Sequence, residues 1–431
     1  VGEIYGFKVK NGGKMIWNTQ PHCGRIIHIK ENELKIFSKT FEGSDKWKGT
    51  KLVSIHADKI LNVIRKIGDF PLNLKDFETK ITVCLDETND VNSGIITRKT
   101  KYPEHDKFEM IYSGVHLYVS NPLYKNPRKV CKIANTDYDI VYLDYINEDY
   151  LARTNYVPAI SNFGLIEKVK GFKVKSIDGK NEYDNWLDYY HLGFRKMIAS
   201  EMERTLTGAI IPPNTSHING VISVTFKQLD LLVELTGLTS SLILDFFIKT
   251  VGAANLYDTR INSFPLGIAP KYKPQLFIRT LMLNCLNKYY APLWEESWQE
   301  AYKHDSWSKA DSRLKPFNTL TPEWQWSSPL RNWYERRWAL VEIDVITAMA
   351  LGLTLDELIL IYNVQFPVLQ QNEDDTWYDR RGNIIFTCSK GLNGVGIDRP
   401  EWEKISQEVN PLQRTLISGD TYTHTITKSE L

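Results

Sequence analysis

The sequence has no paired cysteines. Its five cysteines, Cys23, Cys84, Cys131, Cys285 and Cys388, lie far apart, are odd in number and never form a C-x-x-C pair. This spacing argues against a disulfide framework and against a cysteine-rich zinc site. We therefore expect reduced, buried thiols.

Long apolar runs and low-complexity tracts are also missing. The longest nearly apolar segment, between Asp344 and Asp356, is shorter than the roughly 18–20 residues that cross a bilayer. The N-terminus lacks the charged-then-apolar pattern of a secretory signal. With 42% hydrophobic and 24% charged residues, the composition is that of a globular protein. These absences predict a soluble, cytoplasmic protein with no membrane partner.

The net charge of +1 neither predicts nor excludes a nucleic-acid partner, but the charges are unevenly distributed. Between Arg98 and Lys132 there are eight Lys or Arg against three Asp or Glu, whereas the residues from Asp137 to Asp149 include five acidic and no basic ones. Only the first of these segments suits a phosphate backbone. An unevenly charged, solvated surface is the alternative interpretation.

A self-contained active site has no support in the sequence. Asn121-Pro122-Leu123-Tyr124 is similar to the Asp/Asn-Pro-Pro-Tyr loop that holds a flipped adenine in methyltransferases, but Leu replaces the second Pro. No glycine-rich strand-to-helix turn for adenosylmethionine precedes it. Glu78-Thr79-Lys80 near Asp69 and Asp76 offers only a common, nuclease-like triplet. We predict no catalytic residue and no metal ligand, and we expect a loop at the glycine-rich 391–396 segment.

Hydrophobic periodicity predicts an α+β fold, with a β-rich N-terminal half and a mainly helical C-terminal half. Strands are expected at Arg25–Ile29, Leu34–Phe37, Lys80–Leu85, Gly114–Val119, Ile140–Leu143, Leu206–Ile211 and Ile218–Phe226. Helices are expected at Ala57–Lys66, around 184–200, at Leu229–Leu235, at Ser241–Thr250 and along most of the chain after Pro274.

Two features of the C-terminal half indicate buried helical packing. Seven of the twelve tryptophans lie between Trp294 and Trp338. The segment 335–351 places Trp338, Val341 and Val345 on one helical face. Thr354 and Glu357 have the spacing of a capping box, and the segment 377–386 has the pattern of a β-hairpin.

These patterns suggest three subdomains. We expect a β-rich target-recognition subdomain at 1–165, an α/β recognition subdomain at 166–273 and a helical subdomain ending in a β-hairpin at 274–431. Because the sequence starts at Val1 without a methionine, we interpret it as a fragment of a longer protein.

Three stretches resemble one protein family. The first runs from Ile111 through the Asn121–Tyr124 tetrad to Pro158, and the second is Glu203-Arg204-Thr205-Leu206 with Ile211-Pro212-Pro213. The third begins at Tyr334-Glu335-Arg336-Arg337-Trp338. Together they resemble the C-terminal target-recognition region of type IIG-like restriction-modification DNA adenine-N6 methyltransferases.

The resemblance implies a DNA-reading module whose catalytic domain is absent from this chain. It implies double-stranded DNA and an N-terminal methyltransferase domain of the same polypeptide as partners. No cofactor is expected in this chain, and S-adenosylmethionine would belong to the full-length protein. The candidate DNA-binding residues are Lys125, Asn126, Arg128, Lys129, Arg153, Tyr156, Arg204 and His217. For Arg204 a structural role, pairing with a carboxylate at a helix-to-strand corner, is an equal alternative.

Two other classes of function stay open. One is an enzyme in its own right, either a degenerate methyltransferase or a metal nuclease. The other is a protein-interaction module of a phage-defence complex, which the tryptophan-rich 294–338 segment suggests because aromatic residues anchor interfaces. Packed core is the alternative use of those tryptophans.

Overall fold

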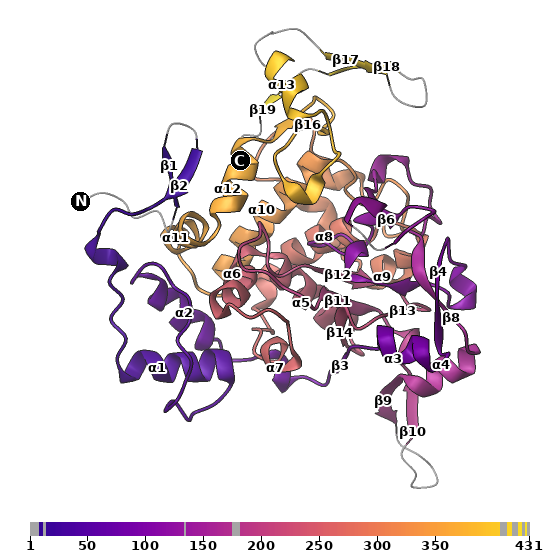
Figure 1. The fold of residues 1–431 in the computed structure, drawn as a ribbon, viewed down its shortest axis with the longest axis horizontal. Coiled ribbons are helices and arrows are strands. Elements are labelled where there is room, and N and C mark those ends of the chain that lie inside the picture. Colours follow the sequence, from indigo (N-terminus) through magenta and orange to yellow (C-terminus); the bar gives the residue numbers. More distant parts are fainter. Residues whose placement is uncertain are drawn as a thin grey trace.

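The computed structural model describes residues 8–11, 14–132, 135–174, 182–405, 412–415, 421–424 and 427–428. Strands fall mainly in the first half of the chain and helices dominate the second half (Figure 1). This confirms the predicted α+β class.

The centre of the molecule is a four-stranded antiparallel sheet with the order β12-β11-β14-β3. Its strands are β12 Gly208–Ile211, β11 His191–Arg195, β14 Val221–Thr225 and β3 Lys80–Thr82. All residues of β12 and β14 are buried. Gly193 in β11 packs closely against the neighbouring strand, because a Cβ atom there would lie 2.5 Å from the Cδ1 atom of Ile211 and would force that side chain to shift.

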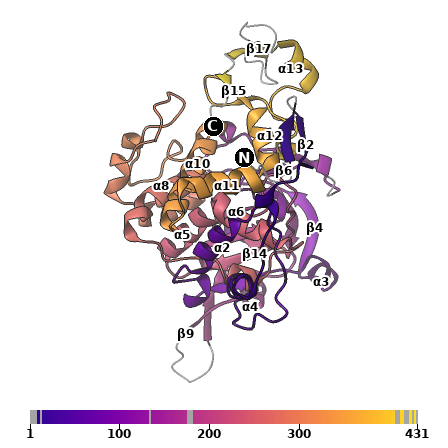
Figure 2. The same ribbon diagram turned by 90° about the vertical axis from the view of Figure 1, so that its left-hand side faces the viewer.

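Helices pack against this sheet and against one another in the middle of the molecule (Figure 2). Helix α5 contacts β11 and β12, and α8 and α10 both pack on α5. The main helices are α5 Leu229–Ser240, α6 Leu242–Val251, α8 Lys273–Asn284, α10 Trp333–Ala350, α11 Leu355–Gln365 and α12 Pro367–Asp374. One hydrophobic core joins residues from Phe37 to Leu369.

Shorter elements surround this core. The remaining helices are α1 Glu31–Phe37, α2 Ile60–Gly68, α3 Glu87–Asn92, α4 Asn162–Lys168, α7 Asp258–Ile261, α9 Ala291–Glu296 and α13 Arg399–Ile405. Paired peripheral strands are β1 Lys8–Asn11 with β2 Lys14–Trp17, β4 Ile96–Lys101 with β8 Thr154–Pro158, β5 Ile111–Tyr112 with β13 Ser216–His217, β6 Lys125–Pro127 with β7 Tyr138–Ile140, and β9 Lys170–Val174 with β10 Glu182–Asn185. Near the C-terminus lie β15 Trp377–Tyr378, β16 Ile384–Phe386, β17 Leu412–Thr415, β18 Thr421–His424 and β19 Thr427–Lys428.

Several predicted elements are confirmed at nearly the expected positions. The strands at 206–211 and 218–226 are β12 and β14, and the helical pair is α5 and α6. The hairpin at 377–386 is present, with Gly382 at a φ of +83° in its turn. The capping box is also present, since the Thr354 hydroxyl accepts from the Glu357 amide at 3.3 Å and the Glu357 carboxylate accepts from the Thr354 amide at 2.8 Å.

Four sequence predictions of local structure are wrong. Residues 25–29 contain no strand, 34–37 belong to helix α1, and 114–119 begin with a short 3-10 helix. The segment 184–200 holds no α-helix: it contains the three-residue 3-10 helix Trp186–Asp188 and the strand β11. Strand β11 lies inside its sheet, and four of its five residues are buried, so its buried residues do not alternate with polar ones.

The buried face of α10 also differs from the predicted one. Trp338 and Val341 are half-buried, and Val345 is 41% exposed. The side chains that face the core include Glu335, Arg336, Ala339, Glu342, Ile343 and Thr347. Charged residues can occupy this face because each has partners, such as the 2.6 Å ion pair between Glu342 and Arg279.

Two further observations concern absences expected from the sequence. All five cysteines are free, but Cys23 is exposed and only Cys285 is fully buried, so the expectation of buried thiols is wrong for Cys23. Among the described residues, no single helix is long and apolar enough to span a membrane.

Candidate nucleic-acid interface

Two short strand pairs, one lying in sequence between the strands of the other, bring most of the predicted DNA-binding residues to one side of the molecule. Strand β6 carries Lys125 and Asn126 and pairs with β7, while β8 pairs with the basic strand β4. Strands β4, β6 and β8 lie on the same side of the molecule in Figure 1. Residues separated by almost thirty positions therefore become neighbours.

Tyr102, Asn126 and Arg153 form a contact cluster, which we call the Tyr102 cluster. The Arg153 amide donates to Asn126 Oδ1 at 2.8 Å, and Arg153 Nη1 donates to the Pro127 carbonyl at 3.1 Å. The guanidinium lies 4.2 Å from the centre of the Tyr102 ring, which is itself 49% exposed. This stacking fixes the direction of the Arg153 side chain.

Sequence reasoning missed Tyr102. The available signal was its position, because Tyr102 directly follows the basic strand β4 and an exposed aromatic ring beside cations is a common feature of protein surfaces that bind nucleic acids.

Lys125 precedes Asn126 in β6, and its ammonium group lies 5.0 Å from the centre of the Tyr124 ring. Partial burial and the nearby Arg195 lower the pKa of Lys125.

Arg128 and Lys129 follow directly after β6, and both are exposed. Arg128 makes a surface ion pair with Asp139 at 2.8 Å, and this hydrogen-bonded carboxylate raises the pKa of Arg128. Lys129 makes no ion pair with any residue that the structure describes. A phosphate would therefore compete with Asp139 for Arg128 but not for Lys129.

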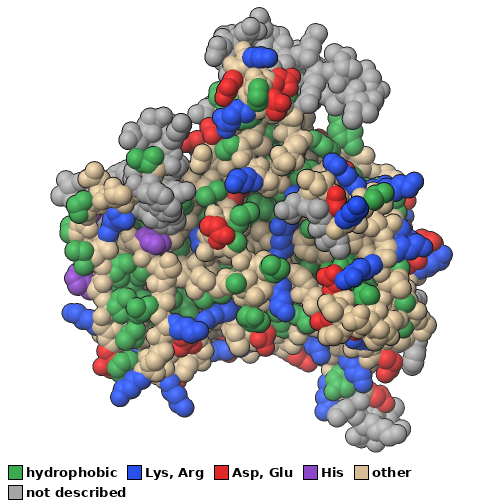
Figure 3. Space-filling model, viewed as in Figure 1, with side chains coloured by type: hydrophobic (Ala, Val, Ile, Leu, Met, Phe, Trp, Pro, Cys, Tyr) green, Lys and Arg blue, Asp and Glu red, His purple; other side chains and the backbone are tan. Residues whose placement is uncertain are grey.

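Six of the eight cations between Arg98 and Lys132 have exposed side chains: Arg98, Lys99, Lys107, Arg128, Lys129 and Lys132. Three of them form ion pairs with carboxylates of the same chain, with Glu87, Glu104 and Asp139 as partners. In Figure 3, Lys and Arg side chains gather at the right of the view with a few acidic ones among them, over β4, β6 and β8. Lys99, Lys129 and Lys132 have no ion-pair partner within the described parts of the chain.

Tyr156 lies beneath this surface. Its side chain is only 2% exposed and packs with Ile96 and Ile111. Burial raises the pKa of Tyr156, and hydrogen bonds to Tyr156 and Glu87 raise the pKa of the exposed Arg98. Tyr156 can therefore position Arg98 but has no exposed ring surface with which to contact DNA.

Arg204 is buried and pairs with a carboxylate, as the alternative to a DNA contact expects. Its Nε donates to Asp245 Oδ2 at 2.5 Å and its Nη2 donates to the Ser240 carbonyl at 2.7 Å. Asp245 also accepts from the Thr205 amide at 3.0 Å. These bonds fix the chain before β12 to the end of α5 and to α6, and they separate Arg204 from the exposed cations.

His217 is fully buried in β13. Its Nε2 lies 2.8 Å from Ser223 Oγ, and its Nδ1 lies 3.2 Å from the Ile218 carbonyl. A carbonyl only accepts, so Nδ1 carries the proton and Nε2 accepts from the serine. Burial lowers the pKa of His217 to about 4, and the same cause lowers the pKa of the buried His116 to about 4. Neither imidazole is placed to meet a phosphate.

These two histidines predict acid sensitivity. Their folded pKa values lie below the usual 6.5, so the unfolded chain binds protons first as the pH falls. Their stabilising contribution is complete above pH 6.5 and is lost between 6.5 and 4, by roughly 3 kcal/mol for each histidine. Urea unfolding at several pH values should show this loss. The pH dependence should weaken in His217→Asn and persist in the exposed control His28→Asn; an unchanged dependence in His217→Asn would contradict the assignment.

The Asn121–Tyr124 tetrad forms a buried turn. All four residues are buried, and Asn121 Oδ1 accepts from the Leu123 amide at 3.0 Å. Tyr124 stacks on Tyr118, with ring centres 4.7 Å apart. The preceding Ser120 has a φ of +47°, in the left-handed region. The tetrad thus shapes the loop before β6.

The described residues contain no group of three or more His, Cys, Asp or Glu that could hold a metal ion. Glu78, in the triplet that resembles a nuclease site, instead pairs with Lys227 at 3.1 Å.

The tryptophans of the 294–338 segment are packed rather than displayed. None of the seven is exposed. Indole Nε1 groups donate to protein acceptors, for example Trp294 to the Thr321 carbonyl at 3.0 Å and Trp324 to the Cys285 carbonyl at 2.9 Å. Trp326 donates to the Ile146 carbonyl at 2.8 Å. Because these tryptophans pack within the protein, the tryptophan-rich segment no longer suggests a protein-interaction module.

Comparisons with known proteins add weak structural similarity alone. No protein-family model matches the chain, and no curated protein matches it. Among solved structures, the chain is similar to the type IIL restriction-modification enzyme MmeI in complex with DNA, with 14% sequence identity and a TM-score of 0.26. The match covers 63% of this chain and 36% of that chain, so this chain spans well under half the length of MmeI. A TM-score of this size does not establish a shared fold.

Proposed function

We propose that this chain is the sequence-specific DNA-recognition part of a bacterial restriction-modification DNA methyltransferase. The observation that carries the proposal is the exposed meeting of β6, β8 and the basic strand β4, with the Tyr102 cluster between them. Aromatic, amide and guanidinium groups lie there beside lysines without ion-pair partners in the described chain. This is the mixture that contacts base edges and phosphates together.

The side chains on this surface differ in how firmly their neighbours hold them in place. Arg153 is fixed by a carbonyl, by Asn126 and by the Tyr102 ring, so its guanidinium is preorganised to read a base edge. Lys129 and Lys132 are exposed on a loop after β6 and suit the less directional phosphate contacts. Arg204, His217 and Tyr156 act as supports within the fold.

The catalytic step belongs to a domain outside this chain. On the family resemblance, that domain precedes the recognition region in the same polypeptide, binds S-adenosylmethionine and methylates the N6 atom of adenine. This chain contributes the choice of sequence and no catalytic residue. The complete protein would serve in restriction-modification or a related phage-defence system in the cytoplasm.

Two measurements on the isolated chain test the proposal. Fluorescein-labelled duplexes of mixed sequence should bind, as followed by fluorescence anisotropy; a chain that binds none of them would disprove the function.

The chain should not transfer methyl groups. Incubation with labelled S-adenosylmethionine and the same duplexes is expected to leave the DNA unlabelled, because the Asn121–Tyr124 tetrad is a buried turn. Labelling that disappears in Asn121→Ala would instead make the chain a methyltransferase in its own right.

A further inference from the structure

Two cations, Arg195 and Lys125, lie beside one stacked pair of tyrosines. The rings of Tyr118 and Tyr124 stack with their centres 4.7 Å apart. The guanidinium of Arg195, the last residue of β11, lies 5.9 Å from the centre of the Tyr118 ring and 5.4 Å from that of Tyr124. The ammonium group of Lys125 lies 5.0 Å from the centre of the Tyr124 ring. We call these four residues the Arg195 cluster.

Arg195 is held by the backbone and not by a carboxylate. Its Nε donates to the Gly114 carbonyl at 2.6 Å. Its Nη groups bond to no residue that the structure describes, and none of the described carboxylates forms an ion pair with it. The side chain is half-buried, and this burial lowers the pKa of Arg195. Because charged groups that leave water are normally paired, Arg195 is set up to meet an anion from outside the chain.

Lys125 adds a second positive charge beside the first. It is also half-buried, and it makes no ion pair within the described ranges. Burial and the neighbouring charge of Arg195 both lower the pKa of Lys125, so the two cations repel each other. An anion bound between them would turn this repulsion into two attractions.

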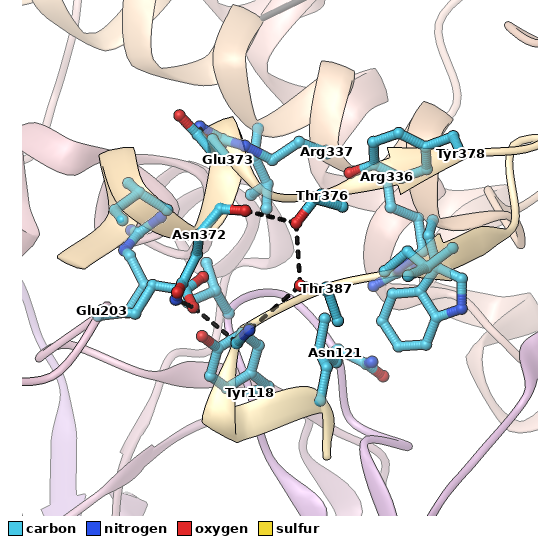
Figure 4. A pocket seen from close by; sticks show the side chains of 18 residues that line it. Tyr118, Asn121, Glu203, Arg336, Arg337, Asn372, Glu373, Thr376, Tyr378 and Thr387 are labelled. Atoms are coloured by element: carbon cyan, nitrogen blue, oxygen red, sulfur yellow. Dashed lines mark hydrogen bonds and ion pairs between the residues drawn. The ribbon is translucent and has the colours of Figure 1, made fainter. Parts of the chain in front are cut away.

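The carboxylate of Glu203 has partners of its own. Together with Tyr118 it lines a cavity of about 110 Å³ (Figure 4). Glu203 Oε2 accepts from Asn372 Nδ2 at 2.6 Å and from Ser389 Oγ at 2.8 Å. The cavity is smaller than the roughly 150 Å³ that holds one benzene molecule, so we assign no ligand to it. Glu203 therefore serves the packing of this region and leaves Arg195 unneutralised.

Strand β6 joins the Arg195 cluster to the proposed DNA surface. Lys125 and Asn126 are successive residues of β6, and successive side chains of a strand point to opposite faces. Asn126 belongs to the Tyr102 cluster, which contains Arg153. Cations therefore lie on both faces of the same short strand.

We propose that Arg195 and Lys125 bind one phosphate group. A guanidinium offers two parallel N–H groups to phosphate oxygens, and a lysine adds a point charge. The stacked tyrosines hold the guanidinium from behind. The phosphate comes either from the DNA backbone, next to the bases that the Tyr102 cluster contacts, or from a free phosphate. Only the first source rests on the proposed function.

The DNA source predicts the loss of a phosphate contact. Arg195→Gln removes the charge and should lower the affinity about tenfold, and equally for duplexes of every sequence. Arg195→Lys keeps the charge and should lose less, which separates the loss of charge from a disturbance of the fold. Fluorescence anisotropy measures the affinities, and thermal unfolding checks that each variant folds.

A double variant tests whether the two cations share one phosphate. Arg195→Gln combined with Lys125→Ala removes the whole contact, so the slope of log affinity against log salt should flatten by roughly one unit. Two separate phosphate contacts would flatten the slope by about two units and would overturn the shared site.

Lys196→Gln is the matched control. Lys196 is the next residue and is also half-buried, but its ammonium group lies 5.9 Å from the centre of the Tyr257 ring instead of beside the stacked tyrosines. This variant removes the same charge and should change neither the affinity nor the salt slope. An effect as large as that of Arg195→Gln would mean that only net charge matters and would overturn the inference.

The free-phosphate source has its own arm. Thermal unfolding is followed in potassium phosphate and in potassium chloride of equal ionic strength. A ligand that binds the folded chain raises its unfolding temperature, so phosphate should stabilise the unchanged chain and Lys196→Gln more than Arg195→Gln.

The two arms separate the inference from the proposed function. Phosphate stabilisation that is lost in Arg195→Gln, without any duplex binding by the unchanged chain, keeps the phosphate site and disproves the proposed function. Duplex binding that the double variant leaves unchanged, together with equal stabilisation of all variants by phosphate, overturns the inference and leaves the proposed function intact.

Discussion

Replacing Arg204 by alanine is expected to destabilise the chain by about 3–5 kcal/mol. The side chains of Arg204 and Asp245 are 3% and 0% exposed, so removing the guanidinium leaves a buried carboxylate without its charged partner. It also leaves the Ser240 carbonyl without its donor. The free energy of unfolding, measured in urea at neutral pH, should report this loss.

The ion pair between Arg128 and Asp139 provides the matched control. Its side chains are 56% and 57% exposed, and surface pairs of this kind contribute about 1 kcal/mol or less. Arg128→Ala should therefore unfold almost like the unchanged chain. A similarly small effect of Arg204→Ala would contradict the structural role of Arg204 and return it to the DNA-binding candidates.

The Arg204 pair also shows which parts of the fold the sequence could predict. Strands β12 and β14 and helices α5 and α6 carry apolar runs bounded by Pro, Gly or Ser, and local patterns were enough to place them. The partner of Arg204 lies forty-one residues further along the chain. The sequence suggested that Arg204 pairs with a carboxylate. Which carboxylate this is depends on how α6 packs.

The errors have a common physical cause, which is burial on more than one side. Strand β11 lies inside its sheet with four of its five residues buried, so polar residues do not alternate along it and its residues could be fitted to a helical rhythm. Helix α10 buries Arg336 and Glu342 against partners from other segments, whereas Val345 stays exposed. An apolar-face argument fails there because paired charges replace apolar residues in the core.

For the candidate site, the segment was easier to predict than its individual residues. The basic stretch from Arg98 to Lys132 does supply six exposed cations. Tyr102 was missed because its contact with Arg153 joins positions far apart in sequence, and Tyr156 was included although it lies beneath the surface. Strand pairing decides both outcomes, and a single sequence does not reveal which strands pair.

Duplex binding is expected to weaken about a hundredfold when salt rises from 50 to 200 mM, if four of the exposed cations contact phosphates. Each neutralised phosphate releases counterions and contributes about −0.9 to the slope of log affinity against log salt. Asp139→Asn should strengthen binding, because it frees Arg128 and removes a negative charge from the surface. Affinity that does not depend on salt would exclude phosphate contacts by this segment.

Single substitutions then separate phosphate contacts from base contacts. Lys129→Ala should lower affinity about equally for all duplexes and flatten the salt slope by roughly one unit, since Lys129 is exposed and has no ion-pair partner in the described chain. Arg128→Ala should cost about 1–3 kcal/mol on the preferred sequence alone if Arg128 reads a base. The control Lys59→Ala removes an exposed lysine at the start of α2, on the opposite side of the molecule in Figure 1, and should change neither the affinity nor the salt slope.

Anisotropy on several duplexes at two salt concentrations measures all three variants. Unchanged binding in both Lys129→Ala and Arg128→Ala would mean that the basic segment is only solvated surface, and because Arg204 and His217 are buried, neither could replace it without a rearrangement of the core.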